Sequence, residues 1–491
     1  MVVMTDRLPH WIGGRRVESA AADTVPVFNP ATGEVLAATP LGGPLEVERA
    51  VAAACAAFAA WRATPVSERI QPLFRLKELL ETHFEALARQ VTTEHGKTLA
   101  EARGSVRRGI QMVETACAMP LLMQGLASED IAAGIDCQTI RRPLGVCAAI
   151  APFNFPAMVP MWFWPFALAA GNTFVLKPSE RVPLTALRIA ELLAEAGLPP
   201  GVFNMVHGGK AAADALLIHP DIRAVSFVGS TPVAAHVYAT AAAAGKRVQA
   251  LGGAKNFMVV LPDAGFDQAA ATALESIIGC AGERCLAGSV LISVGDQTAS
   301  EMRRRIIERA RRVRLGNGLD PATDMGPLIS PAARRRVEGL IAGAVEQGAE
   351  LDLDGRDPAA PADSCFLAPT VLAGITEDMT IAREEVFGPV VLLAAAQSLD
   401  EAIDWINRCP LANTTTLFTS HGAAARQFCH EAAPTMIGIN IGVPAPMSYY
   451  SFGGSRRSFF GDLRAHGREG AMFYTESVVT IARWLQNGRI W

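Results

Sequence analysis

The sequence predicts an α/β protein built on parallel sheets whose faces are covered by helices. Three observations lead to this fold class. The chain has 491 residues, more than one compact core normally holds, so two or three domains are expected. Half of the residues are hydrophobic and 19% are charged, which is a globular composition and not a disordered one. Short apolar runs alternate with amphipathic helical stretches, which is the pattern of a parallel sheet.

The first part of the chain, residues 41–126, is expected to be helical, because its Ala-rich and mixed-charge stretches are good helix formers. Residues 143–176 follow without a single charged side chain, so they imitate a membrane span. They also contain five prolines, which a lipid-exposed helix could not absorb. We therefore expect a buried strand, a Pro-rich loop, a short apolar helix and a second strand, all in the core of the protein.

Strands and helices then alternate along the chain. Strands are expected at 145–152, 172–178, 203–208 and 222–229, and helices between them at 184–197, 211–219 and 233–245. A second set starts near residue 255, with a helix around 300–313 and strands near 368–373 and 390–395. The alternating SVVTIARW at 477–484 predicts an edge strand that reaches a partner subunit.

Charge and cysteine content limit the possible classes of function. A net charge of -4 disfavours nucleic-acid binding, and the Arg-rich helix around 300–313 is expected to be a solvated amphipathic helix. Nine cysteines lie far apart with no CxxC pair, so we expect neither a disulfide framework nor a metal site, and a cytoplasmic setting. The first residues contain no long apolar run, so no signal peptide is expected.

Two motifs place reactive or polar side chains among small residues. In AGERCLAG, 281–288, a cysteine flanked by glycines permits close approach of a substrate, although a buried cysteine is more often inert and Cys280 stands nearby. In APFNFP, 151–156, the amide of Asn154 could donate to a developing oxyanion, or it could cap a turn.

Two further motifs end strands where α/β sheets bind ligands. NTFVLKPSE, 172–180, ends a strand with Lys177, and Pro178 stops the ladder. SFVGSTP, 226–232, opens a helix with Gly-Ser-Thr, whose free N–H groups suit a phosphate, as in many such turns. No GxGxxG fingerprint is present.

Together and in this order, the four motifs resemble the aldehyde dehydrogenase superfamily. The resemblance extends nearly from end to end and includes FNPATGEVL (28–36), ALGGAKN (250–256), LGNGLDPATDMGPLIS (315–330) and EEVFGPV (384–390). Within the superfamily the chain is similar to the CoA-acylating branch that acts on methylmalonate semialdehyde. The family fold implied is a Rossmann-type cofactor domain, an α/β catalytic domain and a β oligomerisation arm.

The resemblance implies a catalytic pair and a set of cofactor contacts. Cys285 matches the nucleophile, and Asn154 the side-chain oxyanion donor, with the backbone N–H of Cys285 as second donor. The positions implied for NAD are Ala151, Phe153, Lys177, Glu180, Arg181, Ser230, Gly252, Glu385 and Phe387. Within this set, Lys177 and Glu180 would hold the adenosine ribose, Ser230 the pyrophosphate and Glu385 the nicotinamide ribose. Glu180 would repel a 2′-phosphate, which favours NAD over NADP.

One departure from the family pattern is informative. Hydrolytic members carry a glutamate in an ELGGK-type motif, where it activates water, and this chain has Leu251 at that position. Leucine cannot take a proton, so hydrolysis should lose about 10²–10⁴-fold of general-base assistance. The acyl-enzyme then needs a thiol such as coenzyme A, already partly thiolate near neutral pH.

The expected function is therefore NAD-dependent, CoA-acylating oxidation of malonate or methylmalonate semialdehyde, with decarboxylation to acetyl-CoA or propionyl-CoA. Arg108 and Arg284 match arginines of this branch that would bind the substrate carboxylate, and Arg107 competes with Arg108 for that role. Two alternatives are an NAD-dependent aldehyde dehydrogenase that releases a free acid, and a structural protein that has lost catalysis.

The resemblance also implies a domain layout. Residues 1–124 and 147–255 would form the NAD-binding domain, 256–450 the catalytic domain, and 125–146 with 451–491 the oligomerisation arm. The expected assembly is a homotetramer, and the expected partners are the aldehyde and coenzyme A, without nucleic acid or membrane.

Overall fold

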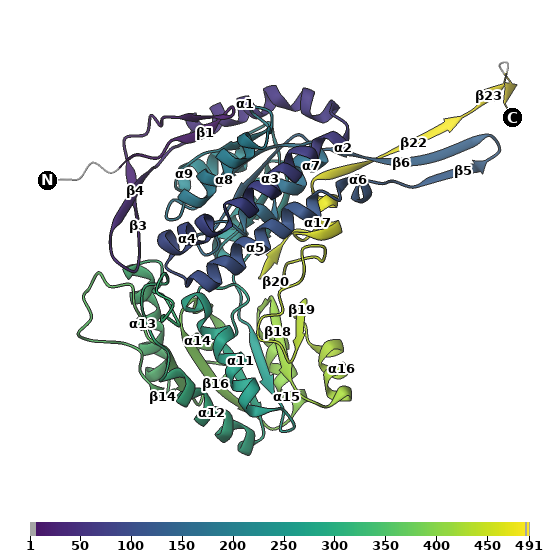
Figure 1. Ribbon diagram of the computed structural model, residues 1–491. Helices are drawn as coiled ribbons and strands as arrows, with labels where there is room; N and C mark the ends of the chain where they lie inside the picture. Colours follow the sequence, from purple (N-terminus) through teal and green to yellow (C-terminus); the bar gives the residue numbers. More distant parts are fainter. Residues whose placement is uncertain (1–5, 487–488, 491) are drawn as a thin grey trace.

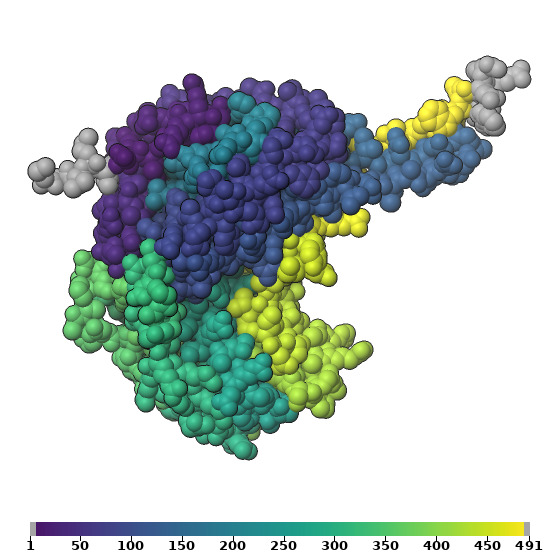
Figure 2. Space-filling view, viewed as in Figure 1, coloured from purple at the N-terminus to yellow at the C-terminus, as the bar shows by residue number. Residues whose placement is uncertain are grey.

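The computed structural model describes residues 6–486 and 489–490, so the first five residues of the segment considered above as a signal peptide lie outside the described part. The chain forms two lobes, each built on one large sheet, and an arm that projects from one side (Figure 1). Figure 2 shows the second lobe, in green, against the first, with part of the C-terminal segment in yellow between them.

The first lobe holds an eight-stranded sheet in the order β2-β1-β9-β8-β7-β10-β11-β21. Its strands are β1 (His10–Ile12), β2 (Arg15–Val17), β7 (Val146–Ile150), β8 (Thr173–Lys177), β9 (Phe203–Met205), β10 (Ile222–Val228), β11 (Arg247–Leu251) and β21 (Phe459–Phe460). The central run from β9 to β11 is parallel, while β1, β2 and β21 pair antiparallel at the two edges. Chain order reverses beside β7, since β8 and β9 extend to one side and β10 and β11 to the other.

Helices cover both faces of this sheet. They are α1 (Pro44–Ala63), α2 (Val66–Arg69), α3 (Gln71–Thr82), α4 (Phe84–His95), α5 (Leu99–Ala116), α6 (Met119–Leu122), α7 (Trp164–Ala170), α8 (Leu184–Glu195), α9 (Lys210–Ile218), α10 (Thr231–Ala243) and α17 (Gly467–Phe473), with the 3₁₀ turn η1 (Pro160–Trp162). The prediction for residues 143–176 is confirmed: β7 and β8 are buried along their whole length and enclose the loop and the apolar helix α7. No described helix is both long and apolar enough to cross a membrane.

The second lobe holds a seven-stranded sheet in the order β14-β15-β16-β13-β12-β18-β19, parallel except for β14. Its strands are β12 (Phe257–Val260), β13 (Val290–Val294), β14 (Glu350–Leu353), β15 (Thr370–Ala373), β16 (Val390–Ala396), β18 (Thr414–Phe418) and β19 (Met436–Ile439). Its helices are α11 (Phe266–Ile278), α12 (Asp296–Ala310), α13 (Pro331–Glu346), α14 (Thr380–Arg383), α15 (Leu399–Arg408) and α16 (Gly422–Glu431), with the 3₁₀ turn η2 (Gly279–Gly282). The arginines of α12 form ion pairs on its solvated face, with acids such as Glu301 and Asp267.

The arm is a three-stranded antiparallel sheet of β5 (Ala127–Ala132), β6 (Ile135–Pro143) and β22 (Thr475–Arg483), in which β22 pairs with β6 over its full length. Residues 451–474, which the sequence grouped with the arm, lie elsewhere: β21 pairs with β11 in the first sheet, and α17 packs on α7. Smaller pairs are β3 (Thr24–Phe28) with β4 (Val35–Pro40), β17 (Leu411–Ala412) with β20 (Ser455–Arg456), and β23 (Leu485–Gln486) with β24 (Arg489–Ile490).

Candidate active site

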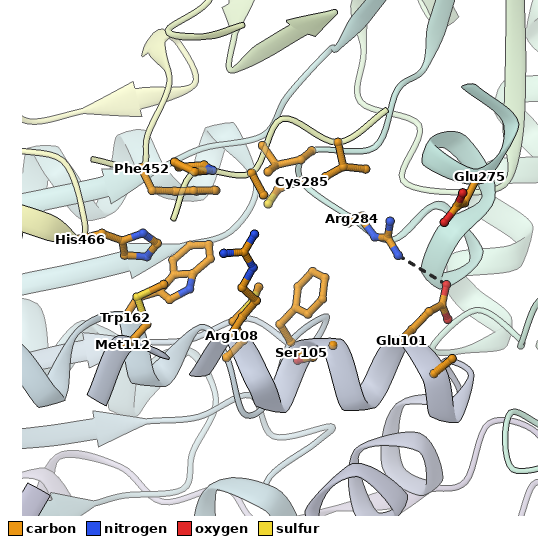
Figure 3. A pocket seen from close by; sticks show the side chains of 18 residues that line it. Glu101, Ser105, Arg108, Met112, Trp162, Glu275, Arg284, Cys285, Phe452 and His466 are labelled. Carbon is orange, nitrogen blue, oxygen red and sulfur yellow. Dashed lines mark hydrogen bonds and ion pairs between the residues drawn. The ribbon is translucent and has the colours of Figure 1, made fainter. Parts of the chain in front are cut away.

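A cavity of about 470 Å³ opens where the two lobes meet. Helix α5 and the segment after β7 form one wall, and the loop that carries Cys285 forms the other (Figure 3). Most of the lining is apolar and aromatic, including Phe155, Met158, Trp162 and Phe452. A cavity of this size suits a small substrate.

The loop that presents Cys285 has an unusual backbone. Cys280, Ala281 and Gly282 follow helix α11 with φ of 53°, 52° and 77°, all in the left-handed region. A Cβ at Gly282 would lie 2.2 Å from the carbonyl oxygen of Gly388, so only glycine fits there. This turn redirects the chain so that Cys285 lines the cavity, whereas Cys280 is buried behind it with 1% exposure.

Two side-chain amides fix the backbone of Cys285. Its carbonyl oxygen accepts hydrogen bonds from Nδ2 of Asn256 at 2.9 Å and from Nδ2 of Asn413 at 3.0 Å. Sequence reasoning missed both contacts, and Asn413 lies in a stretch that showed no signal at all. Burial, followed by the nearby charge of Glu385, raises the pKa of the Cys285 thiol to about 12. The Cys285 sulfur therefore lines the cavity, while burial disfavours its thiolate form in the ligand-free protein.

Asn154 lies against the same loop. It follows β7, is 4% exposed, and donates from Nδ2 to the backbone carbonyl of Glu283 at 3.0 Å. The acceptor, Glu283, stands two residues before Cys285 in the sequence, so the Asn154 amide is held against the loop that carries Cys285. The turn-cap alternative does not describe this contact, because the acceptor lies 129 residues away.

Most of the residues assigned to NAD lie near the carboxyl ends of the parallel strands of the first sheet. Ala151 and Phe153 follow β7, Lys177 ends β8, Ser230 follows β10 and Gly252 follows β11. Because chain order reverses beside β7, this edge contains the crevice in which open α/β sheets bind ligands.

Charged and polar groups at this edge have the chemistry that a dinucleotide needs. The Lys177 ammonium is 4% exposed and donates to Glu180 Oε2 at 3.3 Å and to the carbonyl of Pro178 at 2.9 Å. Arg181 is exposed beside them. Ser230 is the N-terminal cap residue of α10, is exposed, and makes no capping bond with its side chain, so its hydroxyl is free for a phosphate. Pro232, the second residue of the helix, has no N–H to offer.

A second, narrower cleft lies on the other side of the Cys285 loop and is lined by Glu385 and Phe387. Glu385 accepts from the backbone N–H of Ala254 at 3.1 Å, and burial raises its pKa to about 7. A Cβ at Gly253 would lie 2.5 Å from Glu385 Oε2, and one at Gly252 would lie 2.8 Å from the carbonyl oxygen of Arg457. Only glycine fits at these two positions, because protein atoms already occupy the space of a Cβ. The residues present fit a dinucleotide cofactor, because the Lys177–Glu180 pair, the exposed Ser230 and the Glu385 carboxylate offer polar partners at this edge.

The arginines proposed for the substrate differ in their surroundings. Arg108 lines the cavity and points from α5 toward Cys285, with Nη1 3.1 Å from the sulfur of Met447 and 3.3 Å from Gln111 Oε1 (Figure 3). Arg107, which the sequence left as a competitor, forms a two-bond ion pair with Glu81 and does not line the cavity. Arg284 lines the cavity too, but it is turned to Glu101 at 3.5 Å.

Leu251 ends β11 and is 4% exposed, in the same apolar cluster as Leu286 next to the nucleophile. A side chain in this setting supplies no proton acceptor. Among the described residues, no group of three or more His, Cys, Asp or Glu could hold a metal ion.

The chain is similar to known proteins over nearly its whole length. The family model described as "Aldehyde dehydrogenase family" matches residues 17–480. The chain is 47% identical over 485 residues to malonate-semialdehyde dehydrogenase 1 of Geobacillus thermodenitrificans, covering 99% of this chain and 100% of the relative. It is also 47% identical over 483 residues to malonate-semialdehyde dehydrogenase of Pseudomonas aeruginosa, covering 98% of this chain and 97% of the relative.

Two solved structures are similar over the whole chain. One is a methylmalonate-semialdehyde dehydrogenase of Oceanimonas doudoroffii, with a TM-score of 0.96, 44% identity, and coverage of 98% of this chain and 99% of the other. The second, from Sinorhizobium meliloti, is described as a methylmalonate-semialdehyde dehydrogenase complexed with NAD, with a TM-score of 0.97, 41% identity and 99% coverage of each chain. The chain therefore belongs to the aldehyde dehydrogenase family.

Proposed function

We propose that this protein oxidises malonate or methylmalonate semialdehyde with NAD and transfers the acyl group to coenzyme A. The proposal depends on one combination of residues. Cys285 and Arg108 line the same cavity, and the buried Leu251 stands where hydrolytic relatives have glutamate. The names of the relatives in Geobacillus, Pseudomonas and Oceanimonas support the substrate class, and the NAD complex from Sinorhizobium supports the cofactor.

The first step is attack of the Cys285 sulfur on the aldehyde carbon. The thiol reacts as its thiolate after losing its proton to solvent, and burial, which raises the pKa of Cys285, disfavours this form in the ligand-free protein. Asn154 Nδ2 and the Cys285 N–H would then stabilise the oxyanion, and loss of one such donor typically costs about 10²–10³-fold in kcat. This step requires Asn154 to turn its amide from the Glu283 carbonyl toward the substrate.

NAD, when bound, supplies the acceptor for the hydride that leaves the same carbon. Lys177, Glu180, Arg181, Ser230 and Glu385 would hold it, with Ala151, Phe153, Gly252 and Phe387 lining its site. Phe153 and Phe387 stand edge to face with centroids 5.9 Å apart and would keep water from the reacting carbon.

Oxidation leaves a thioester on Cys285. For a 3-oxo acid the acyl group carries a second carboxylate, which can leave as CO2 because the thioester carbonyl stabilises the resulting enolate. Protonation of the enolate gives an acetyl or propionyl group on Cys285. Coenzyme A thiolate then attacks this carbonyl, the bond to Cys285 breaks, and acetyl-CoA or propionyl-CoA leaves.

The remaining parts of the proposal concern organisation. Residues 1–124 and 147–255 would act as the NAD-binding domain, 256–450 as the catalytic domain, and the arm of β5, β6 and β22 as the oligomerisation element of a cytoplasmic homotetramer. The arm supports this role because apolar side chains such as Ile131, Val479 and Ile481 are more than half exposed along it.

The function is tested by incubating the protein with NAD, coenzyme A and three aldehydes: malonate semialdehyde, methylmalonate semialdehyde and propanal. We expect NADH, CO2 and the matching acyl-CoA from the two semialdehydes, identified by absorbance and mass spectrometry. Cys285→Ser should lower NADH formation by more than about 10³-fold, because the serine hydroxyl is a far weaker nucleophile than a thiolate. NADH formation by the serine variant at the parent rate would contradict the proposal.

A further inference from the structure

Lysine is rare in this chain, where only six of the 44 Lys and Arg residues are lysines. Four of the six, Lys97, Lys177, Lys246 and Lys255, are at most 8% exposed. Arginine is the ordinary cation of this sequence, so a buried lysine marks a place where a compact ammonium with three donors fits and a planar guanidinium does not.

Three of these lysines have clear local partners. Lys177 belongs to the proposed cofactor site. Lys246 donates to the backbone carbonyls of Ile222, at 2.9 Å, and His219, near the amino ends of β10 and β11. Lys255 donates to the backbone carbonyls of Ile381, at 2.6 Å, and Glu384, at 3.0 Å.

The fourth, Lys97, lies between α4 and α5 and reaches into the active site. Its Nζ donates to the backbone carbonyl of Asn154 at 2.6 Å and to the sulfur of Cys280 at 3.6 Å. The same atom lies 3.7 Å from the centre of the Phe155 ring, a distance at which a cation is attracted to the ring face. At 1% exposure it has no water to replace these partners.

These contacts join three segments that meet at the reacting atoms. Lys97 holds the backbone of Asn154, while the Asn154 side chain is held by the Glu283 carbonyl of the nucleophile loop. Through Cys280, Lys97 also touches the left-handed turn that presents Cys285. Cys280 in turn contacts Nη2 of Arg284 at 3.5 Å.

We propose that Lys97 is a positioning residue that sets the distance between the Asn154 amide and the Cys285 loop. The proposal rests on the role of Asn154 as oxyanion donor in the function proposed above. Catalysis depends steeply on this geometry, since an oxyanion donor must stand about 2.7–3.1 Å from the developing charge. Without the ammonium, the Asn154 carbonyl becomes a buried acceptor with no partner, and the segment can relieve this only by moving.

The test compares Lys97→Met with a matched control, Lys246→Met. Both remove a buried ammonium that satisfies backbone carbonyls, so both should lower the thermal midpoint. Lys97→Met should lower kcat for the aldehyde about 10–100-fold, with KM and the dissociation constant of NAD within about threefold. Lys246→Met should keep kcat within about twofold, because its partners lie at the opposite end of the sheet. Equal kcat values for the two variants would overturn the proposal.

A double-mutant cycle distinguishes an effect of Lys97 on kcat that acts through Asn154 from one that is independent of Asn154. If Lys97 acts through Asn154, the variant Lys97→Met/Asn154→Ala should have the kcat of Asn154→Ala alone. Losses that multiply would show that Lys97 acts independently of Asn154 and would overturn the proposal. Full activity of Asn154→Ala would instead refute the oxyanion assignment, and the proposal with it.

A second variant covers the case in which Lys97→Met does not fold. Lys97→Gln replaces the ammonium with a neutral amide on a shorter side chain, which can replace the contacts of Lys97 only in part. Its kcat should therefore lie between those of the parent and Asn154→Ala, again with KM nearly unchanged. A folded Lys97→Gln with the parent kcat, or one in which KM alone rises, would contradict positioning by Lys97.

Discussion

Arg107 and Arg108 are neighbours on one helix, yet their side chains have different surroundings. Successive residues on α5 point about 100° apart, so the two guanidinium groups cannot share a target. Arg107 pairs with Glu81 on α3, while Arg108 enters the cavity. The sequence placed both in SVRRGIQ and could rank them only by resemblance, because the face of the helix that meets the substrate is set by tertiary packing.

The pair also provides a matched experiment. Arg108→Ala should lower kcat/KM for malonate semialdehyde by about 10²–10³-fold, since it removes the cation opposite the substrate carboxylate. The loss with propanal, which has no carboxylate, should be at most about threefold. Steady-state kinetics with both aldehydes measure the ratio.

Arg107→Ala serves as the control, because it removes the same group one residue away and should not change that ratio. Equal losses for the two aldehydes in Arg108→Ala would remove the carboxylate role.

Some residues of the site could not be identified from the sequence alone. Cys285 could not be separated from Cys280 by local composition, and the structure distinguishes them because the left-handed turn buries one and presents the other. Asn413 could not be found at all, because its contact with the Cys285 carbonyl joins residues 128 positions apart. The role of Lys97 could not be predicted from the sequence either, although the sequence shows that lysine is rare.

At the scale of elements, periodicity predicted the strands that are buried on both faces. Segment 143–176 is the clearest case, since its prolines and its lack of charge leave few ways to fold. Strand β11, by contrast, begins with Arg247 and carries Gln249, so its sequence lacks an apolar run. Residues 451–474 were misplaced because β21 has two residues, too few for a pattern, and is a strand only through pairing with β11.

The exposed apolar face of the arm leads to a prediction about subunit assembly. Val479 and Ile481 stand on one face of β22 with 58% and 65% of their surface exposed. Replacing both with lysine should break the proposed homotetramer into smaller species, because like charges would face a partner at an apolar surface. Light scattering coupled to size-exclusion chromatography measures the mass.

Thr480→Lys adds one lysine on the opposite face of β22 and is the control, since it should leave the mass unchanged. An unaltered mass in Val479→Lys/Ile481→Lys would show that this face does not hold the assembly together.

At the scale of the molecule, a cavity opens between two lobes that are each built on one large sheet, and both lobes contribute residues to its lining. Asn154 and most of the residues predicted to bind NAD follow strands of the first sheet, and the second lobe supplies Cys285 and Glu385. The alternation of strands and helices predicted two such sheets. Their relative placement could not be predicted from it, because the contacts that set it join residues more than a hundred positions apart, as with Asn154 and Glu283.

The central claim is that the acyl group on Cys285 is released by a thiol and only slowly by water, because Leu251 cannot activate water. Rapid mixing with NAD and malonate semialdehyde, without coenzyme A, measures it most directly. We expect a burst of about one NADH per subunit, an acyl adduct on Cys285 seen by mass spectrometry, and continuous turnover only after coenzyme A is added. Steady release of free carboxylic acid at the full rate without coenzyme A would contradict the account.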